Sequence, residues 1–226
     1  MPHFSVADIQ AFVLTMRLAA TVTGLLLMIG LPLGWWLAHS RAKSSRVVGA
    51  MVALPLVLPP TVMGFYLLLL MGPQGWVGRL MVAAKLDTLP FTFGGLVVAS
   101  MLYSLPFVVQ PLQSMFESIS TRALEVAACL GAGPWDRFFS VVLPMAWPGI
   151  AVATVLGFAH TVGEFGIVLM IGGNRPGVTR VLSIAIYDHF EAGEYAQANQ
   201  LSLCLIAISF IALLTMSLLR RRVRIA

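Results

Sequence analysis

The chain has 226 residues, of which 59% are hydrophobic and only 10% are charged, and its formal net charge is +5. A soluble domain usually carries about 25% charged residues, so this composition excludes an ordinary water-soluble protein. Several apolar runs reach the roughly 20 residues that a helix needs to cross a bilayer. The basic residues are few and lie at the ends of these runs, so we expect membrane lipid, and no nucleic acid, among the partners.

Five apolar segments follow one another along the chain. Each is expected to be helical, because a lone strand in lipid would leave its backbone groups without hydrogen bonds. The predicted spans are residues 18–38, with a start as early as residue 10, then 47–71, 93–109, 148–171 and 198–219. The predicted fold class is therefore an all-α membrane protein of about five transmembrane helices, in which residues 1–226 form a single domain.

The first segment is expected to remain as a span. Asp8 precedes the first basic residue, Arg17, so the positive stretch that opens a secretory signal is missing.

The second and third segments contain prolines, at residues 55–60 and at residue 106. Proline removes a helical hydrogen bond, and broken helices are tolerated in a membrane where they face protein or a water-filled cavity. The pattern favours a translocation pathway and packing kinks about equally. The candidate pathway residues of these segments are Pro59, Pro60, Thr61, Ser100 and Ser104.

A long polar connection, residues 110–147, separates the third and fourth segments. Within it the spacing predicts a short helix, a glycine turn and a second helix. Gly131 and Gly133 are expected to end the first helix with positive φ, and Pro134 suits the first position of the second helix. Pro144 is expected to break that second helix before the fourth segment begins.

The fourth segment contains His160 and Glu164, which share a helix face because they are four residues apart. A carboxylate at mid-bilayer costs about 2.5–3.5 kcal/mol, so Glu164 should face the bundle interior, a partner subunit or the outer mouth. Two interpretations stay open: a gate or latch in the pathway, or a packing hydrogen bond with His160. No His-Glu-x-x-His pattern occurs, and neither a metal site nor a catalytic residue is predicted.

The distribution of Lys and Arg predicts the orientation, because these residues are enriched in cytoplasmic loops. One set of loops holds Arg41, Lys43, Arg46, Arg122, Arg137, Arg220, Arg221, Arg222 and Arg224. The opposite set holds only Arg79, Lys85, Arg175 and Arg180. With five spans, the N-terminus is expected outside and the C-terminus in the cytoplasm.

The segment 117–150, ESISTRALEVAACLGAGPWDRFFSVVLPMAWPGI, resembles the EAA loop of ABC importer permeases. That pattern is Glu-Ala-Ala, three residues, Gly, nine residues, Ile, one residue and Leu-Pro. The matching positions are Glu125, Val126, Ala127, Gly131, Val141, Leu143 and Pro144, of which Val126 and Val141 depart from the pattern. The resemblance implies a type I ABC importer permease fold, in which residues 110–147 are a cytoplasmic coupling loop that docks on an ATPase subunit.

Three further stretches are similar to molybdate permease subunits, with sulfate/thiosulfate and tungstate permeases as near relatives. They are LPLVLPPTVMGFYLLLLMGPQG, YSLPFVVQPLQ and HTVGEFGIVLMIGGNRPGVTRVLSIAIYDH. The resemblance implies a multi-pass protein of the bacterial inner membrane, with a periplasmic N-terminus, that imports molybdate in a binding-protein-dependent way. The implied partners are a second copy of this chain, two ABC ATPase subunits and a periplasmic oxyanion-binding protein.

The chain contains no Gly-Lys dipeptide and therefore no Walker A motif. We expect no enzyme activity and no cofactor in this chain, with ATP and Mg on the partner ATPase. Three alternatives stay open. They are import of sulfate/thiosulfate or tungstate, a membrane-embedded enzyme that uses His160 and Glu164, and a passive channel.

Overall fold

The structure is a computed structural model that describes residues 5–223, except for the side chains of residues 121 and 219–223. The predicted cytoplasmic arginines Arg220, Arg221, Arg222 and Arg224 therefore lie outside the described residues and side chains. All regular structure in the described part is helical. Four helices are long and apolar enough to cross a membrane, and a bent pair counts as a fifth span, which confirms the predicted fold class.

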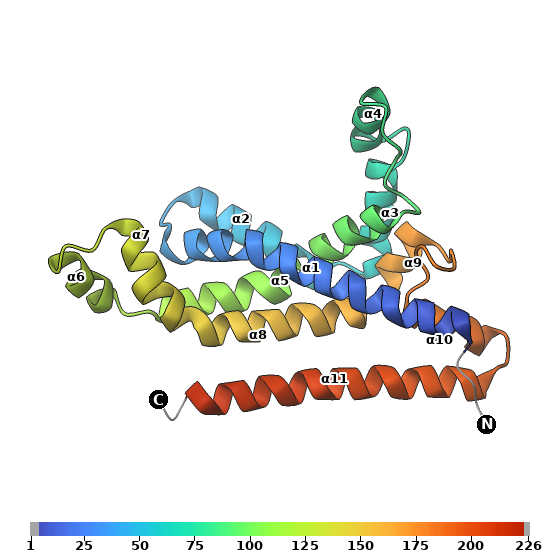
Figure 1. Cartoon of the computed structure of the whole chain (residues 1–226). Helices are drawn as coiled ribbons and strands as arrows, with labels where there is room; N and C mark the ends of the chain where they lie inside the picture. The colour runs from blue at the N-terminus through green and yellow to red at the C-terminus, as the bar shows by residue number, and fades with distance from the viewer. Residues whose placement is uncertain (1–4, 224–226) are drawn as a thin grey trace.

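Three long helices form the centre of the molecule: α1 (Val6–His39), α5 (Phe93–Ser118) and α8 (Leu143–Val162). They lie side by side in Figure 1. α1 begins with a capping box, in which the Ser5 hydroxyl accepts from the Asp8 amide and the Asp8 carboxylate accepts from the Ser5 amide. Leu18, Val22 and Leu26 recur every four residues along α1, so one stripe of this helix enters the core.

The close approach of α5 and α8 depends on small residues. A Cβ atom at Gly157 of α8 would lie 2.6 Å from Val108 Cγ2 of α5, so only glycine fits there without a shift. The contact brings the two helices together just before the end of α8. The geometry of this part of the bundle is therefore set by backbone-to-side-chain packing.

The second predicted span is a broken helix, as its prolines indicated. Residues 47–71 divide into α2 (Lys43–Ala53), a 3₁₀ turn η1 (Leu54–Leu56) and α3 (Pro60–Met71). The axis bends by 113° between residues 43–56 and residues 60–83. The break follows from Pro59 and Pro60, because proline has no amide proton and disfavours helical geometry in the residue before it. With α4 (Trp76–Ala83), α3 forms an arm that projects from the bundle in Figure 1.

The region before the fourth span contains three consecutive helical elements. α6 (Thr121–Cys129) precedes α7 (Pro134–Arg137), which passes through a π-helical turn, η2 (Phe138–Val142), into α8. Residues 134–162 form one helix of 29 residues, so the expectation that Pro144 breaks the helix is wrong. Pro144 occupies the second position of α8, and the π turn before it rearranges the hydrogen bonds that a proline would otherwise remove.

The fourth span also ends earlier than the predicted residue 171. α8 stops at Val162, and a short helix, α9 (Gly166–Gly172), follows after a break. α10 (Leu182–Glu191) and the last long helix, α11 (Tyr195–Val223), complete the chain. α11 runs along α8 and keeps most of its apolar side chains exposed, as expected of a helix that faces lipid.

The bundle has two distinct ends (Figure 1). At the α6 end lie α6, α7 and the end of α1. At the α10 end lie α10, α9, the beginning of α1 and the end of α8.

Candidate functional site

A buried carboxylate marks the α10 end of the bundle. Glu164 lies in the break between α8 and α9, after Gly163 has ended α8, and its side chain is only 1% exposed. Such a group is stable only if hydrogen bonds replace the water that it has lost.

Two serines of α5 provide these hydrogen bonds. The Ser100 hydroxyl donates to Glu164 Oε2 at 2.5 Å, and the Ser104 hydroxyl donates to Oε1 at 2.7 Å. Both serines are fully buried, and they share a helix face because they are four residues apart. The three side chains form a closed polar cluster between helices that are 60 or more residues apart in sequence.

His160 extends this cluster. Its Nδ1 lies 2.9 Å from the Ser104 hydroxyl and 3.6 Å from Glu164 Oε1, and its ring stacks on Phe107 with centroids 3.7 Å apart. Ser104 donates its one hydroxyl proton to Glu164, so Nδ1 of His160 is the donor in its contact with Ser104. The other ring nitrogen has no hydrogen bond within the described residues, and His160 lines the adjacent cavity.

That cavity has a volume of about 630 Å³ and lies between α3, α5, α8 and α9. Of the predicted pathway residues, it is lined by Pro60, Thr61, His160 and Glu164. Ser104 lies behind Glu164 and contacts it by the hydrogen bond above, whereas Pro59 is exposed just before α3 and is not among the lining residues. The structure thus brings most of the predicted set together, and the role of these residues in transport stays a prediction.

The sequence reasoning missed several contributors. Tyr103 and Phe107 flank the His160 ring, and the Ser183 hydroxyl of α10 donates to the Glu164 backbone carbonyl. A signal for two of them was present, since Ser100, Tyr103, Ser104 and Phe107 follow the i, i+3, i+4, i+7 spacing of one helix face. Within the described residues, no group of three or more His, Cys, Asp or Glu is arranged to hold a metal ion.

The predicted coupling-loop residues lie at the opposite end. Glu125 and Val126 are exposed on α6, and Ala127 is half-buried beside them. Gly131 has φ of +86° and ends α6 as expected, but Gly133 has φ of −69°, so the expectation of positive φ there is wrong. Val141 lies in the π turn, and Leu143 and Pro144 begin α8.

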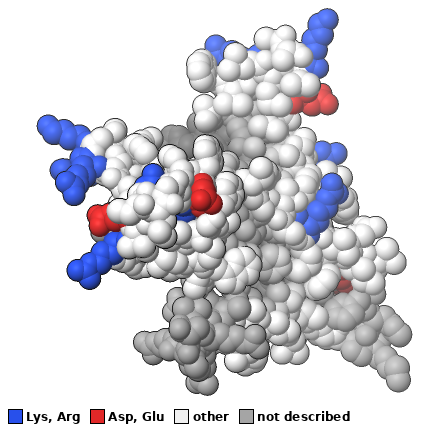
Figure 2. All heavy atoms as spheres, turned by 60° about the vertical axis from the view of Figure 1, so that its left-hand side comes forward, with Lys and Arg blue, Asp and Glu red and all other residues white. Residues whose placement is uncertain are grey.

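Large apolar side chains remain uncovered around this loop. Leu130 is 83% exposed and Trp135 is 77% exposed, and Val126 and Phe139 are also exposed. Figure 2, turned so that this end comes forward, shows charged side chains scattered over a mostly uncharged surface. Exposed apolar patches of this kind mark interaction sites for proteins or membranes.

The comparisons with known proteins agree with this architecture. The family described as "Binding-protein-dependent transport system inner membrane component" matches residues 30–225. The chain is 58% identical to the molybdenum transport system permease protein ModB of Azotobacter vinelandii over 95% of both chains. It is 33% identical to ModB of Escherichia coli K12, over 94% of this chain and 93% of that protein.

A solved structure has the same fold. An inward-facing form of the MetNI methionine ABC transporter aligns with a TM-score of 0.72 at 19% identity, over 96% of this chain and 99% of that chain. At this identity the likeness concerns the fold alone.

Proposed function

The chain belongs to the binding-protein-dependent transport system inner membrane components, and from this we propose that it is the permease subunit of an ATP-driven molybdate importer. The observation that carries the substrate is the 58% identity, over 95% of both chains, to a molybdenum permease. The chain supplies the route across the membrane, and it is a transport subunit rather than an enzyme.

The α6 end is proposed to bind the ATPase subunits, which hold ATP and Mg. Its exposed apolar side chains would be covered by such a partner, and Glu125, Val126, Ala127 and Gly131 lie on or beside that surface. Because the chain has no Walker A motif, nucleotide hydrolysis is assigned to the partner. The α6 end is then cytoplasmic, and the beginning of α1 is periplasmic.

One continuous helix connects this docking surface with the buried cluster. Residues 134–162 begin at α7 and end two residues before Glu164, a distance of about 43 Å at 1.5 Å per residue. A push on α6 and α7 would therefore reach the contacts of His160 and Glu164 with Ser104. We assign the cluster the role of a latch that holds the periplasmic end of the pathway closed until the ATPase subunits move.

The oxyanion is proposed to pass the cavity beside this latch. No predicted span carries a central arginine or lysine that would hold a dianion tightly, so high affinity is left to a periplasmic binding protein. We further propose that two copies of this chain form the transporter, each contributing one coupling loop to one ATPase subunit.

The test is molybdate uptake into vesicles that contain this chain, an ATPase subunit and a molybdate-binding protein. We expect uptake that requires ATP and that excess sulfate inhibits only weakly, with tungstate as the stronger competitor. Equal competition by sulfate would favour the sulfate/thiosulfate alternative. Uptake without ATP would indicate a channel, and chemical turnover by the isolated chain would indicate an enzyme.

A further inference from the structure

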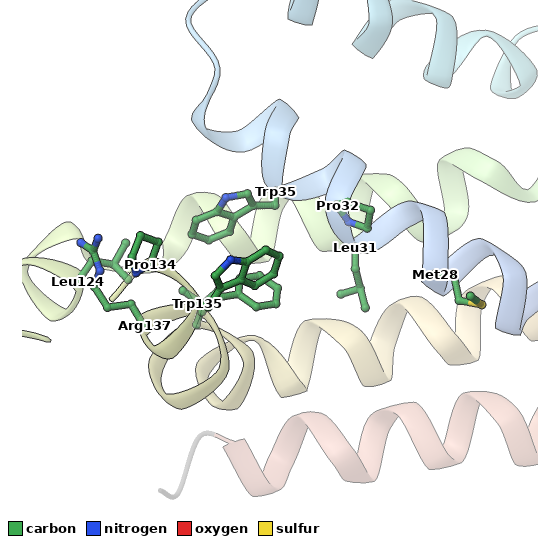
Figure 3. A pocket seen from close by; sticks show the side chains of 10 residues that line it. Met28, Leu31, Pro32, Trp35, Leu124, Pro134, Trp135 and Arg137 are labelled. Carbon is green, nitrogen blue, oxygen red and sulfur yellow. The ribbon is translucent and has the colours of Figure 1, made fainter. Parts of the chain in front are cut away.

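A second cavity lies at the α6 end, away from the Glu164 cluster. It has a volume of about 680 Å³ and opens between the last turns of α1 and the α6–α7 segment. Its lining includes Met28, Leu31 and Trp35 of α1 and Leu124, Trp135 and Arg137 of the loop helices. Figure 3 shows Met28 at one end of the cavity and Arg137 at the other. The cavity is therefore apolar along its length and cationic at one end.

The apolar part has a rigid aromatic wall. The Trp35 ring packs edge-on against Phe116 and Phe138, with centroids 5.3 Å and 5.9 Å apart. Trp35 also lies 3.9 Å from the His39 ring. Because these contacts fix the indole, the cavity is a built feature of the fold rather than a gap that a side-chain rotation would close.

Arg137 leaves its charge available to a ligand. Its Nε is buried, yet it has no hydrogen-bond partner among the described residues, and no ion pair of Arg137 occurs there either. Arg137 lines the cavity and is partly exposed, so an anionic group in the cavity meets the guanidinium without having to displace a carboxylate of the described residues. A guanidinium matches the oxygens of a phosphate group in a bidentate way.

The residues around the cavity are of the kinds that are typical of a membrane surface. The cations Arg41, Lys43 and Arg46 follow α1 at this end of the bundle, and a tryptophan such as Trp35 is typical of the boundary between hydrocarbon and headgroups. Leu31 and Met28 precede Trp35 by about one and two turns of α1, so they lie on the side of the hydrocarbon. The required ligand thus has a long apolar part and an anionic head.

We infer that this cavity binds an anionic phospholipid of the surrounding bilayer, with its phosphate on Arg137 and an acyl chain along Trp35, Leu31 and Met28. The lipid would fill the space behind α6 and α7 and support the docking surface from below. The inference depends on the chain being embedded in a membrane and is independent of the transported ion.

The test uses the full chain in nanodiscs of equal phosphatidylglycerol and phosphatidylcholine, extracted into mild detergent and weighed by native mass spectrometry. One basic residue near a membrane surface contributes about 1 kcal/mol, so we expect about fivefold more phosphatidylglycerol than phosphatidylcholine to be retained. Arg137→Gln should abolish this preference. The matched control Arg46→Gln, an exposed cation of α2 at the same end, should keep it.

A second variant distinguishes a specific loss of lipid binding from misfolding of Arg137→Gln. Leu31→Trp narrows the apolar part and leaves the charge in place, so it should reduce retention of both lipids. Equal retention of the two lipids by the unmodified chain would overturn the inference, as would a preserved preference in Arg137→Gln. Release of the lipid on addition of the ATPase subunit would assign the cavity to that partner instead. None of these readouts uses molybdate, so failure here leaves the proposed transport function to its own test.

Discussion

The two ends of the bundle satisfy their side chains in opposite ways. At the α10 end, Glu164 is bonded to Ser100 and Ser104, and the Thr15 hydroxyl of α1 accepts from the Leu182 amide of α10. At the α6 end, Leu130 and Trp135 are exposed and Arg137 Nε has no partner among the described residues. The Glu164 cluster closes its contacts within the chain, although Arg180 Nε near α10 is also buried without a partner among the described residues, whereas the α6–α7 segment leaves its largest apolar side chains uncovered.

This difference separates two kinds of role. A region whose polar groups are satisfied internally can hold a conformation, because breaking its contacts costs free energy in this chain alone. A region with uncovered apolar side chains gains by binding something else. Variants at the α10 end should therefore change the stability of the isolated chain, and variants at the α6 end should change its partnerships.

The largest effect on stability is expected from Glu164→Ala. The substitution leaves the buried Ser100 and Ser104 hydroxyls without their acceptor, at about 1–3 kcal/mol each, so the free energy of unfolding should fall by about 3 kcal/mol. The measurement is chemical unfolding in detergent micelles. Glu191→Ala is the control, because the hydrogen bond that Glu191 accepts among the described residues, from Tyr187, is exposed, so the change in stability should be less than about 0.5 kcal/mol. Equal losses in the two variants would refute the closed cluster at the α10 end.

The reverse pattern is expected from Leu130→Asp at the α6 end. Leu130 is 83% exposed, so the isolated chain should lose less than about 0.5 kcal/mol of stability. Its affinity for the ATPase subunit should fall at least about tenfold, because a charge would be buried in an apolar contact. Leu86→Asp, at an exposed leucine outside the α6 end, should leave the affinity unchanged in the same titration. Unchanged binding by Leu130→Asp would show that the partner docks elsewhere.

A smaller effect is expected at the turn between α6 and α7, where two glycines form a matched pair. A Cβ atom at Gly131 or at Gly133 would meet nothing within 4 Å, so only backbone geometry distinguishes them. Gly131→Ala must keep φ of +86° at a cost of about 1 kcal/mol, or else reorient α6 and weaken ATPase binding. Gly133→Ala, at φ of −69°, should be neutral in both assays. A larger defect in Gly133→Ala than in Gly131→Ala would contradict the turn geometry.

The helices were predictable from sequence because hydropathy over 20 residues requires no knowledge of packing. The angles and exact positions of the breaks between these helices were not predictable in this way. Pro59 and Pro60 indicate a break, but its 113° angle depends on α3 packing against α9, where a Cβ atom at Gly64 would lie only 2.7 Å from Met170. Hydropathy likewise predicted that the fourth span continues to residue 171. It does not detect that α8 ends before Gly163, or that Glu164 accepts a hydrogen bond from Ser104 of α5.

The same limit applies to the candidate site. The four-residue spacing of His160 and Glu164 predicted one shared helix face, but Glu164 lies beyond the end of α8, and His160 Nδ1 and Glu164 Oε1 nevertheless lie 3.6 Å apart. The stronger partners of Glu164 are Ser100 and Ser104, which are 64 and 60 residues away, so only the tertiary fold reveals them. The pattern that resembles a coupling loop is contiguous in sequence, and its role stays a prediction, whereas the cavity at Arg137 joins α1 to a loop about 100 residues later.

The smallest predicted effect is a pH dependence of stability that arises from His189. This side chain contacts Asp8 and Glu194 near the surface of the α10 end. Its Nε2 lies 2.9 Å from Asp8 Oδ1, and its Nδ1 lies 2.6 Å from Glu194 Oε2. The hydrogen bond with Asp8, followed by that with Glu194, raises the pKa of His189 above 6.5. Both ring nitrogens donate only when the ring is protonated, so the two contacts form together in the imidazolium.

The free energy of unfolding should fall as the pH rises. Because the folded pKa is raised, the stabilisation is fully present below about pH 6.5 and is lost as pH rises through the folded pKa. We expect the free energy of unfolding to decline by about 0.5 kcal/mol over that range, since the cluster is partly exposed to solvent. His189→Gln should flatten this decline, and His39→Gln, an exposed histidine at the α6 end, should preserve it. A decline that survives in His189→Gln would mean that the α10 end owes its pH response to another group.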